Sequence, residues 1–262
     1  MTHFKKYSGF YIPYIIFALT VSLIIIFNDK AALHLRLASF YTETGDVFFK
    51  YYTEVGGNIP FYVIGVLLFY RYRIALTLLI TQLSTGLIAQ VIKRSWDAPR
   101  PVKCFADNFP NIELHKIAGA KLYVHNSFPS GHTTSAFAFF LVLAYFTKNK
   151  ALQFLYFILA VMVGFSRVYL SQHFIVDMLA GSFIGVSVTI LFQLYIEKKI
   201  NKMGRWFIAG CFFEKKELMV LVFRIKYLSL QAQNQTCSFA MCALLSLHFQ
   251  TFIFNKYHVF NV

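Results

Sequence analysis

Six long apolar runs, separated by polar and charged segments, dominate residues 1–200 of the chain. The runs cover residues 10–27, 59–70, 74–92, 131–146, 151–165 and 174–196. An α-helix rises ~1.5 Å per residue, so roughly 20 apolar residues cross the hydrocarbon core of a bilayer. The run at 59–70 is too short to cross the bilayer alone, and we expect its helix to begin about one turn earlier, within residues 53–58. The pattern therefore predicts an all-α, polytopic membrane helical bundle with six transmembrane helices.

The composition agrees with a membrane protein. Hydrophobic residues make up 58% of the chain and charged residues only 14%, whereas about a quarter of a soluble domain is charged. The net charge of +14 is spread in short groups between the apolar runs, as in cytoplasmic loops that face anionic lipid. We therefore expect a bilayer partner and no nucleic-acid partner. The four cysteines form no CxxC pair, so neither a disulfide framework nor a cysteine metal site is expected.

Basic residues predict which ends of the helices face the cytoplasm. The basic groups are Lys5 with Lys6, Arg71 with Arg73, Lys148 with Lys150, and Lys198 and Lys199 with Lys202. If six helices alternate in direction, all four groups fall on one face, which the positive-inside tendency makes cytoplasmic. Segments 28–58, 93–128 and 166–173 then lie on the opposite face, the first of them as an exposed segment. Segment 93–128 also carries six basic residues, which we discount because several belong to a candidate site.

The two ends of the chain need separate interpretation. The run at 10–27 is longer than a usual signal-peptide core and lacks a small-x-small cleavage site, so a retained first helix is expected. Residues 1–200 are expected to form the membrane domain, and residues 201–262 a C-terminal tail. The tail contains apolar runs at 218–230 and 237–254. The second run is a seventh helix, part of a loosely folded appendage, or sequence foreign to the domain.

The first polar cluster follows the third apolar run. Lys93 lies at the end of that run, and Arg100 follows seven residues later between Pro99 and Pro101. Proline fixes φ and disfavours helix in the residue before it, so the arginine is presented from a stiff turn. A lysine and a fork-shaped guanidinium together suit a phosphate group. The alternative is a pair of cations that extend to lipid headgroups.

The second cluster, Pro129-Ser-Gly-His132, begins the fourth apolar run. Proline suits a first helical position, and the exposed N–H groups of Ser130, Gly131 and His132 would point at an anion. His132 adds a group that titrates near neutral pH. The alternative is an ordinary helix cap with an interfacial histidine.

The third cluster lies between the fifth and sixth runs. Arg167 is a candidate anion ligand, and His173 a candidate nucleophile or base. On a helix that starts near His173, Asp177 is at i+4 and shares its face. Ionisable groups at such positions in membrane proteins are usually functional. The alternative is a buried polar contact that joins two helices.

In order, the clusters read Lys-x6-Arg-Pro, Pro-Ser-Gly-His and Ser-Arg-x5-His-x3-Asp. Over residues 10–196 the chain resembles the type 2 phosphatidic acid phosphatase family at each motif position. That family shares its motifs with vanadium haloperoxidases, but the latter have a soluble fold. The resemblance implies a phosphatase that binds phosphate through Lys93, Arg100, Ser130, Gly131 and Arg167.

The resemblance also implies how the reaction proceeds. His173 would attack phosphorus to give a phosphohistidine, Asp177 would orient His173, and His132 would act as general acid and then general base. No metal and no cofactor are expected, because three cations and two histidines supply the charge. The expected substrate is a membrane lipid phosphate: lipid A, undecaprenyl pyrophosphate, phosphatidylglycerol phosphate or phosphatidic acid.

The expected location is a bacterial inner (plasma) membrane, with the site facing the periplasm or exterior. A non-catalytic lipid-phosphate-binding or transport protein is the alternative function. It would need the cations but not both His132 and His173.

Overall fold

The structure is a computed structural model that describes residues 3–211 except 38, 116, 118 and 120–122. The chain divides into two compact units, residues 1–199 and 200–262. Everything below concerns the first unit. The expected tail runs at 218–230 and 237–254 lie outside the described residues.

Helices make up the secondary structure, and the described residues contain no strand. The helices are α1 (His3–Lys6), α2 (Ser8–Phe27), α3 (Lys30–Leu37), α4 (Glu43–Tyr52), α5 (Ile59–Tyr70), α6 (Tyr72–Ser95), α7 (Pro101–Asn108), α8 (Gly131–Tyr145), α9 (Lys150–Tyr169) and α10 (Ile175–Cys211), with a 3-10 helix, η1 (Thr53–Gly56), between α4 and α5. The all-α prediction is confirmed for the described residues, and each of the six apolar runs lies in a helix.

Four helices are long and apolar enough to cross a membrane: α2, α6, α9 and residues Ile175–Tyr195 of α10. Glu43–Gly56 and Ile59–Tyr70 form a pair that passes the same test when joined, although it is bent by 49°. The apolar helix α8 is shorter. The described residues therefore contain four or five candidate spans, and the count of six stays a prediction.

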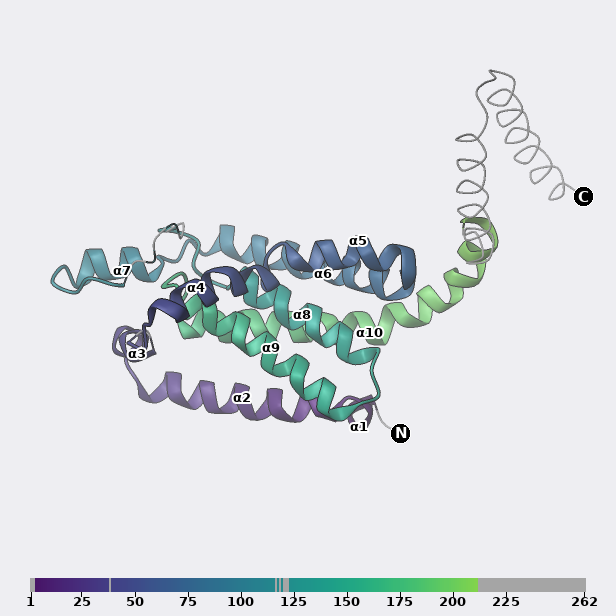
Figure 1. Cartoon of the computed structure of the whole chain (residues 1–262), viewed down its shortest axis with the longest axis horizontal. Helices are drawn as coiled ribbons and strands as arrows, with labels where there is room; N and C mark the ends of the chain where they lie inside the picture. The colour runs from purple at the N-terminus through teal and green to yellow at the C-terminus, as the bar shows by residue number, and fades with distance from the viewer. Residues whose placement is uncertain (1–2, 38, 116, 118, 120–122, 212–262) are drawn as a thin grey trace, which may run out of the picture. The chain divides into compact units, whose positions relative to one another are not determined.

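The helix α8 lies at the centre of the unit (Figure 1). It packs against α6, α9 and η1, while α2 packs on α9 and α5 on α6. Eleven of its fifteen residues are buried, because small and aromatic side chains such as Ala136, Phe137 and Ala138 fill the space between the surrounding helices. A residue at the start of α8 is therefore held by several helices at once.

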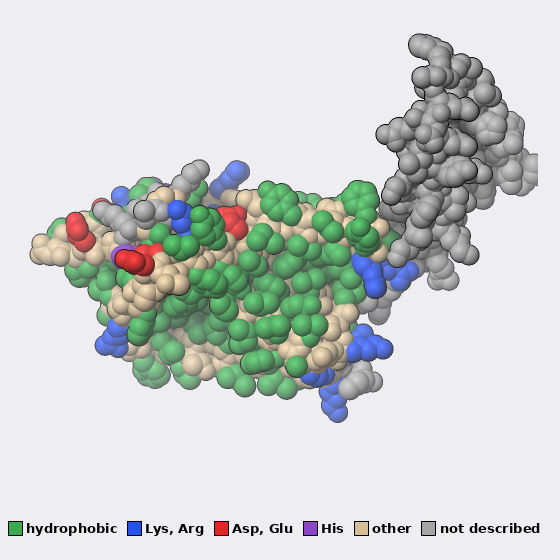
Figure 2. Space-filling view, in the orientation of Figure 1, with side chains coloured by type: hydrophobic (Ala, Val, Ile, Leu, Met, Phe, Trp, Pro, Cys, Tyr) green, Lys and Arg blue, Asp and Glu red, His purple; other side chains and the backbone are tan. Residues whose placement is uncertain are grey.

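The outer helices expose large apolar side chains, as expected of a surface that contacts lipid tails. Examples from α2 are Ile16 and Phe27, which are 60% and 80% exposed. In the face shown in Figure 2, hydrophobic side chains form a broad band, with Lys and Arg towards both of its ends and Asp and Glu towards one end only.

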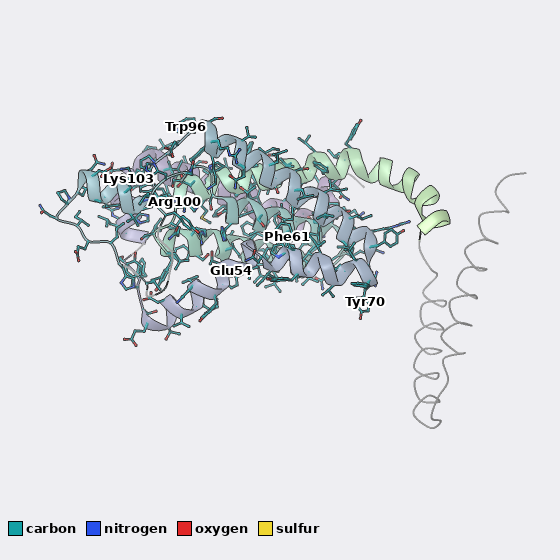
Figure 3. The ribbon with its side chains drawn as sticks, turned by 90° about the horizontal axis from the view of Figure 1, so that it is seen from above. Glu54, Phe61, Tyr70, Trp96, Arg100 and Lys103 are labelled. Atoms are coloured by element: carbon teal, nitrogen blue, oxygen red, sulfur yellow. The ribbon has the colours of Figure 1, made fainter. Side chains whose placement is uncertain are left out.

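The two ends of the unit differ in what they contain. At one end, the Lys150 Nζ atom donates hydrogen bonds to the carbonyl oxygens of Lys5 and Lys6, which joins the N-terminal segment to the α8–α9 connection. The α5–α6 turn, with Tyr70, lies far from Arg100 (Figure 3). The predicted basic segments at residues 5–6, 71–73 and 148–150 thus share one end. The opposite end carries the three motifs.

Candidate active site

His173 and Asp177 meet where α10 begins. The His173 Nδ1 atom lies 3.4 Å from Asp177 Oδ2, and both side chains are almost fully buried. The same Asp177 oxygen accepts hydrogen bonds from the Phe174 N–H (2.9 Å) and the Ser127 hydroxyl (2.5 Å). These two donors hold the carboxylate still, so it can fix the orientation of the imidazole.

Burial lowers the pKa of His173 to about 3, although the contact with Asp177 opposes this change. The positive charges of Arg167 and Arg100 act in the same direction as burial. The ring is therefore neutral near pH 7. A neutral ring that carries its proton on Nδ1, the atom 3.4 Å from Asp177 Oδ2, leaves the lone pair of Nε2 available for attack.

Arg100, the residue directly before α7, is held in place by hydrogen bonds from its side chain to His125 and Gln172. Its Nε donates to the His125 carbonyl (2.8 Å), and its Nη1 donates to the backbone and side-chain oxygens of Gln172 (3.1 Å each). The guanidinium also lies over the ring of Tyr123, 5.1 Å from its centroid. Burial lowers the pKa of Arg100, but guanidinium is so basic that it remains a cation. Arg100 thus connects the first motif directly to the residue preceding His173.

Lys93 and Arg167 complete the set of cations. Lys93 Nζ donates to the Asn126 carbonyl (2.9 Å). Arg167 Nη1 donates to Thr53 Oγ1 (2.8 Å), while its Nε is buried without a hydrogen-bond partner. Lys93, Arg100 and Arg167 interact electrostatically with one another. A buried donor with no partner is costly, so this N–H is suited to bind an oxygen of a ligand.

The second motif forms the N-terminus of α8. The Ser130 Oγ caps the helix by accepting from the N–H and hydroxyl of Thr133. Gly131 lies beside Lys93, since a Cβ atom there would be 3.9 Å from Lys93 Cε. His132 interacts electrostatically with Arg167, His173, Lys93 and Arg100. The structure thus brings the second motif to the cations and the histidine of the other two.

Main-chain hydrogen bonds connect the motifs to one another. The Ser130 N–H donates to the Asp177 carbonyl (3.0 Å), which joins the start of α8 to the start of α10. The Arg100 N–H donates to the Val124 carbonyl, and the Ser127 N–H to the Ala98 carbonyl (2.9 Å each). All eight residues expected at the site therefore lie in one connected region.

The η1 segment is a part of the site that the sequence did not predict. Segment 28–58 was expected to be exposed, but Thr53 and Gly56 are buried. A Cβ atom at Gly56 would collide with the His132 carbonyl and with Val163, so only glycine lets η1 lie this close to α8. The expectation of an exposed segment is wrong here. The adjacent Gly56-Gly57 pair was the available signal.

His34 of α3 is a second unexpected neighbour. It is buried against the rings of Phe105 and Phe174, and its Nε2 lies 3.3 Å from Ser171 Oγ. Burial lowers the pKa of His34 to about 4. His34 thus packs against residues on either side of the Gln172-His173 pair.

Within the part of the chain that the structure describes, no three His, Cys, Asp or Glu side chains are grouped as metal ligands would be. Metal independence stays a prediction.

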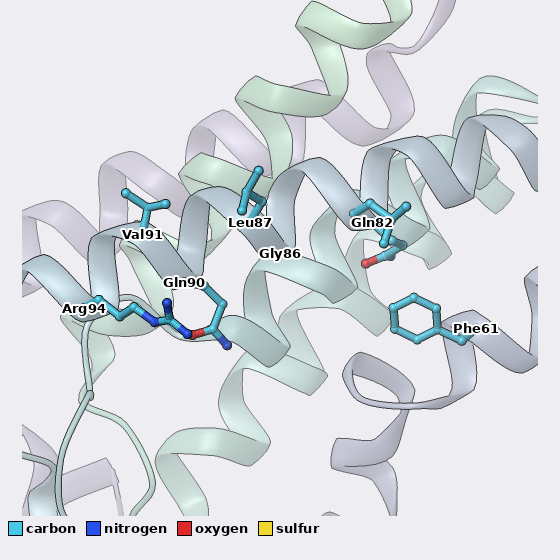
Figure 4. Close-up of a pocket in the computed structure, with 8 residues that line it drawn as sticks. Phe61, Gln82, Gly86, Leu87, Gln90, Val91 and Arg94 are labelled. Atoms are coloured by element: carbon cyan, nitrogen blue, oxygen red, sulfur yellow. The ribbon is translucent and has the colours of Figure 1, made fainter.

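An apolar groove lies on the surface of α6. It has a volume of about 450 Å³ and runs along α6 on the side where Phe61 of α5 faces it (Figure 4). Its lining is Phe61, Gln82, Leu83, Gly86, Leu87, Gln90, Val91 and Arg94. Arg94 lies at one end of this lining, but Lys93 is not part of it, because consecutive residues of a helix point in different directions.

Comparisons with known proteins agree with the motifs. The sequence model of the PAP2 superfamily matches residues 74–201, which confirms the resemblance. Lipid phosphate phosphatase 2 of Arabidopsis thaliana is 34% identical over 159 residues, which is 50% of this chain and 55% of that protein. Phosphatidylglycerophosphatase B of Bacillus subtilis is 38% identical over 81 residues, 28% of this chain and 40% of that protein. The chain thus spans about half, or less, of the length of these curated relatives.

Two solved structures share the fold. The crystal structure of LpxE from Aquifex aeolicus has a TM-score of 0.56 and 24% identity, and covers 64% of this chain and 97% of that one. The crystal structure of a transmembrane PAP2-type phosphatidylglycerolphosphate phosphatase from Bacillus subtilis has a TM-score of 0.52 and 24% identity. It covers 74% of this chain and 96% of that one. Both matches concern the fold alone.

Proposed function

Residues 74–201 of this chain belong to the PAP2 superfamily, and from this premise we propose that the protein is an integral-membrane lipid phosphatase. The observation that carries the proposal is the neutral His173, held by Asp177 and surrounded by Lys93, Arg100 and Arg167. Cations bind a phosphate, but a buried neutral imidazole with an oriented lone pair is what a nucleophile requires.

The reaction proceeds in two balanced steps. In the first, His173 Nε2 attacks phosphorus, a P–N bond forms and the P–O bond to the lipid breaks. His132, which takes up a proton from solution when the anionic phosphate binds beside it, gives that proton to the leaving alkoxide. Asp177 stabilises the positive charge that develops on the ring of His173, as a carboxylate does beside a catalytic histidine.

In the second step, water attacks the phosphohistidine and the P–N bond breaks. His132 takes the proton from water, inorganic phosphate leaves and His173 returns to its neutral form. Lys93, Arg100 and Arg167, with Ser130 and the Gly131 N–H, neutralise the phosphoryl oxygens throughout. Phosphoryl transfer depends mainly on such positioning and charge neutralisation. No step requires a metal ion.

The substrate is a lipid whose phosphate reaches the site from the membrane. The groove along α6 is apolar over Phe61, Leu83, Leu87 and Val91, which suits an acyl chain. The candidates are phosphatidic acid, phosphatidylglycerol phosphate, lipid A and undecaprenyl pyrophosphate. The names of the curated relatives, a lipid phosphate phosphatase and a phosphatidylglycerophosphatase, support this class.

The basic segments at residues 5–6, 71–73 and 148–150 lie at the end opposite the site. With those segments in the cytoplasm, the site lies on the non-cytoplasmic face of the membrane. In a bacterium, this is the periplasmic or exterior face of the inner (plasma) membrane.

The test is to incubate the purified protein with the candidate lipids and to measure inorganic phosphate. We expect turnover that persists in EDTA and is blocked by vanadate, an analogue of five-coordinate phosphorus. His173→Ala should lower the rate by about 10⁴-fold or more while the lipid still binds. Hydrolysis that survives this substitution refutes the nucleophile, and strict dependence on a divalent ion refutes the metal-free mechanism.

A further inference from the structure

Glu54 is a carboxylate beside the site that no motif contains. It belongs to η1, directly after Thr53, which accepts the hydrogen bond from Arg167. Its Oε2 atom accepts a hydrogen bond from Asn58 Nδ2 (3.1 Å), and its charge interacts with Arg167. Figure 3 shows Glu54 on the Arg100 side of Phe61, towards the end of the helices that carries the motifs.

Gly57 shows how close Glu54 is to His132. A Cβ atom at position 57 would be 2.9 Å from Glu54 Oε2 and 3.2 Å from His132 Nε2. The two atoms are therefore separated by no more than the sum of these distances, 6.1 Å. Because residue 57 is glycine, the space between the carboxylate and the imidazole contains no side chain of that residue. A group of the substrate that is next to His132 is also next to Glu54.

The two carboxylates near the cations differ in position. Asp177 contacts the nucleophile His173, whereas Glu54 lies beside His132, the acid that protonates the leaving group. A phosphate monoester has an uncharged alkoxy group there, and a diphosphate has a second anionic phosphoryl group. An anion a few ångströms from a carboxylate is repelled, and most strongly where water is excluded.

We propose that Glu54 is a specificity-determining residue that selects lipid phosphate monoesters over lipid diphosphates. This inference rests on the proposed function and deepens it by narrowing the substrate class of the same site. It favours lipids such as phosphatidic acid over undecaprenyl pyrophosphate.

The test compares two substrates with the same lipid part, phosphatidic acid and diacylglycerol pyrophosphate. Initial rates of phosphate release give kcat/KM for each with the full-length protein. In Glu54→Gln, the ratio of kcat/KM for the diphosphate to that for the monoester should rise about tenfold, a repulsion of about 1.4 kcal/mol. Glu54→Asp keeps the charge and should keep the wild-type ratio within about threefold.

Glu43→Gln is the matched control, because it removes the same charge from an exposed position on α4. It should leave the ratio unchanged. An unchanged ratio in Glu54→Gln overturns the proposal, as does an equal rise in Glu43→Gln. Loss of both activities in Glu54→Gln also overturns it, because the carboxylate would then serve the chemistry and not the selection. If the wild-type protein releases phosphate from none of the candidate lipids, the proposed function itself fails.

Discussion

The two ends of the helical unit both carry clusters of cations, but in opposite environments. At the end with the N-terminal segment, Lys5, Lys6, Arg71, Arg73, Lys148 and Lys150 are all exposed. At the other end, Arg100 and Arg167 are only 7% and 6% exposed. Burying a guanidinium costs several kcal/mol unless anions compensate for the lost hydration. The same residue types are therefore hydrated at one end, which the proposed orientation places in the cytoplasm, and buried at the other end, where they are the proposed phosphate ligands.

At the buried end, the cations outnumber the carboxylates that interact with them. Among the described residues, Asp177 and Glu54 are the acidic groups that interact with Lys93, Arg100 and Arg167. Three cations thus face two carboxylates. An anionic phosphate would supply the missing negative charge, and the exposed cations at the other end require no such partner because water solvates them.

The largest loss of activity is expected from a substitution at Asp177, at the buried end. Asp177→Asn removes the charge that selects the tautomer of His173, so kcat should fall by about 10⁴-fold. The measurement is phosphate release under saturating lipid, with vanadate binding to check that the anion site persists. A loss of less than tenfold would mean that Asp177 only holds α10 in place.

A matched pair of arginines tests the contrast between the two ends directly. Arg167→Met removes a cation that faces the phosphate and should lower kcat/KM by about 10³-fold. Arg73→Met removes an exposed arginine at the other end and should change kcat/KM by less than about twofold. Both variants are compared at equal amounts of folded protein. Similar losses in the two variants would contradict the division between the ends.

A pair of glycines tests the space beside His132. Gly57→Ala places a methyl group between Glu54 and His132, where the leaving group would lie, and should lower kcat/KM by about tenfold. Gly65→Ala is the control, because a Cβ atom at Gly65 meets no atom within 4 Å. It should leave kcat/KM unchanged. Full activity in Gly57→Ala would show that the substrate does not use this space.

The smallest expected effect is a dependence of stability on pH. Burial lowers the pKa of His34 to about 4 and that of His173 to about 3. Below the ordinary histidine pKa near 6.5, these two histidines bind protons in the unfolded chain but stay neutral in the folded chain. The free energy of unfolding therefore decreases as the pH falls from about 6.5 to about 4.

Thermal unfolding in detergent should show this fall as a decrease of a few degrees in Tm between about pH 7 and about pH 5. His34→Asn removes one of the two groups and should reduce the decrease, and activity should be measured alongside. The charges that act on His34 are those of Asp177 and Lys30. An undiminished decrease in His34→Asn would assign the effect to other groups.

Much of the fold was predictable because a lipid-facing helix needs a continuous apolar run. Each predicted run lies in a helix, and the i+4 spacing of His173 and Asp177 placed them together as expected. Three short motifs in order carried the family resemblance. The span count was less predictable, because the 49° bend before α5 and the short α8 are properties of three-dimensional packing.

The contribution of η1 was not predictable for a different reason. Glu54 stands in a mixed polar segment, and hydrophobic pattern gives no partner for such a residue. Its place beside the site depends on Gly56, where a missing Cβ lets two backbones approach. His34 was missed likewise, because one histidine on a short helix has no periodic signal. Close approach of backbones leaves little trace in a single sequence beyond the presence of glycine.

The main-chain hydrogen bond from the Ser130 N–H to the Asp177 carbonyl bears on how this protein could change in evolution. It aligns two motifs whatever side chains they carry, as do the backbone bonds at Arg100 and Ser127. A descendant that lost both histidines would keep this frame and its cations. Catalytic activity can therefore be lost while the fold is kept. Such a descendant could still bind lipid phosphates although it no longer hydrolyses them.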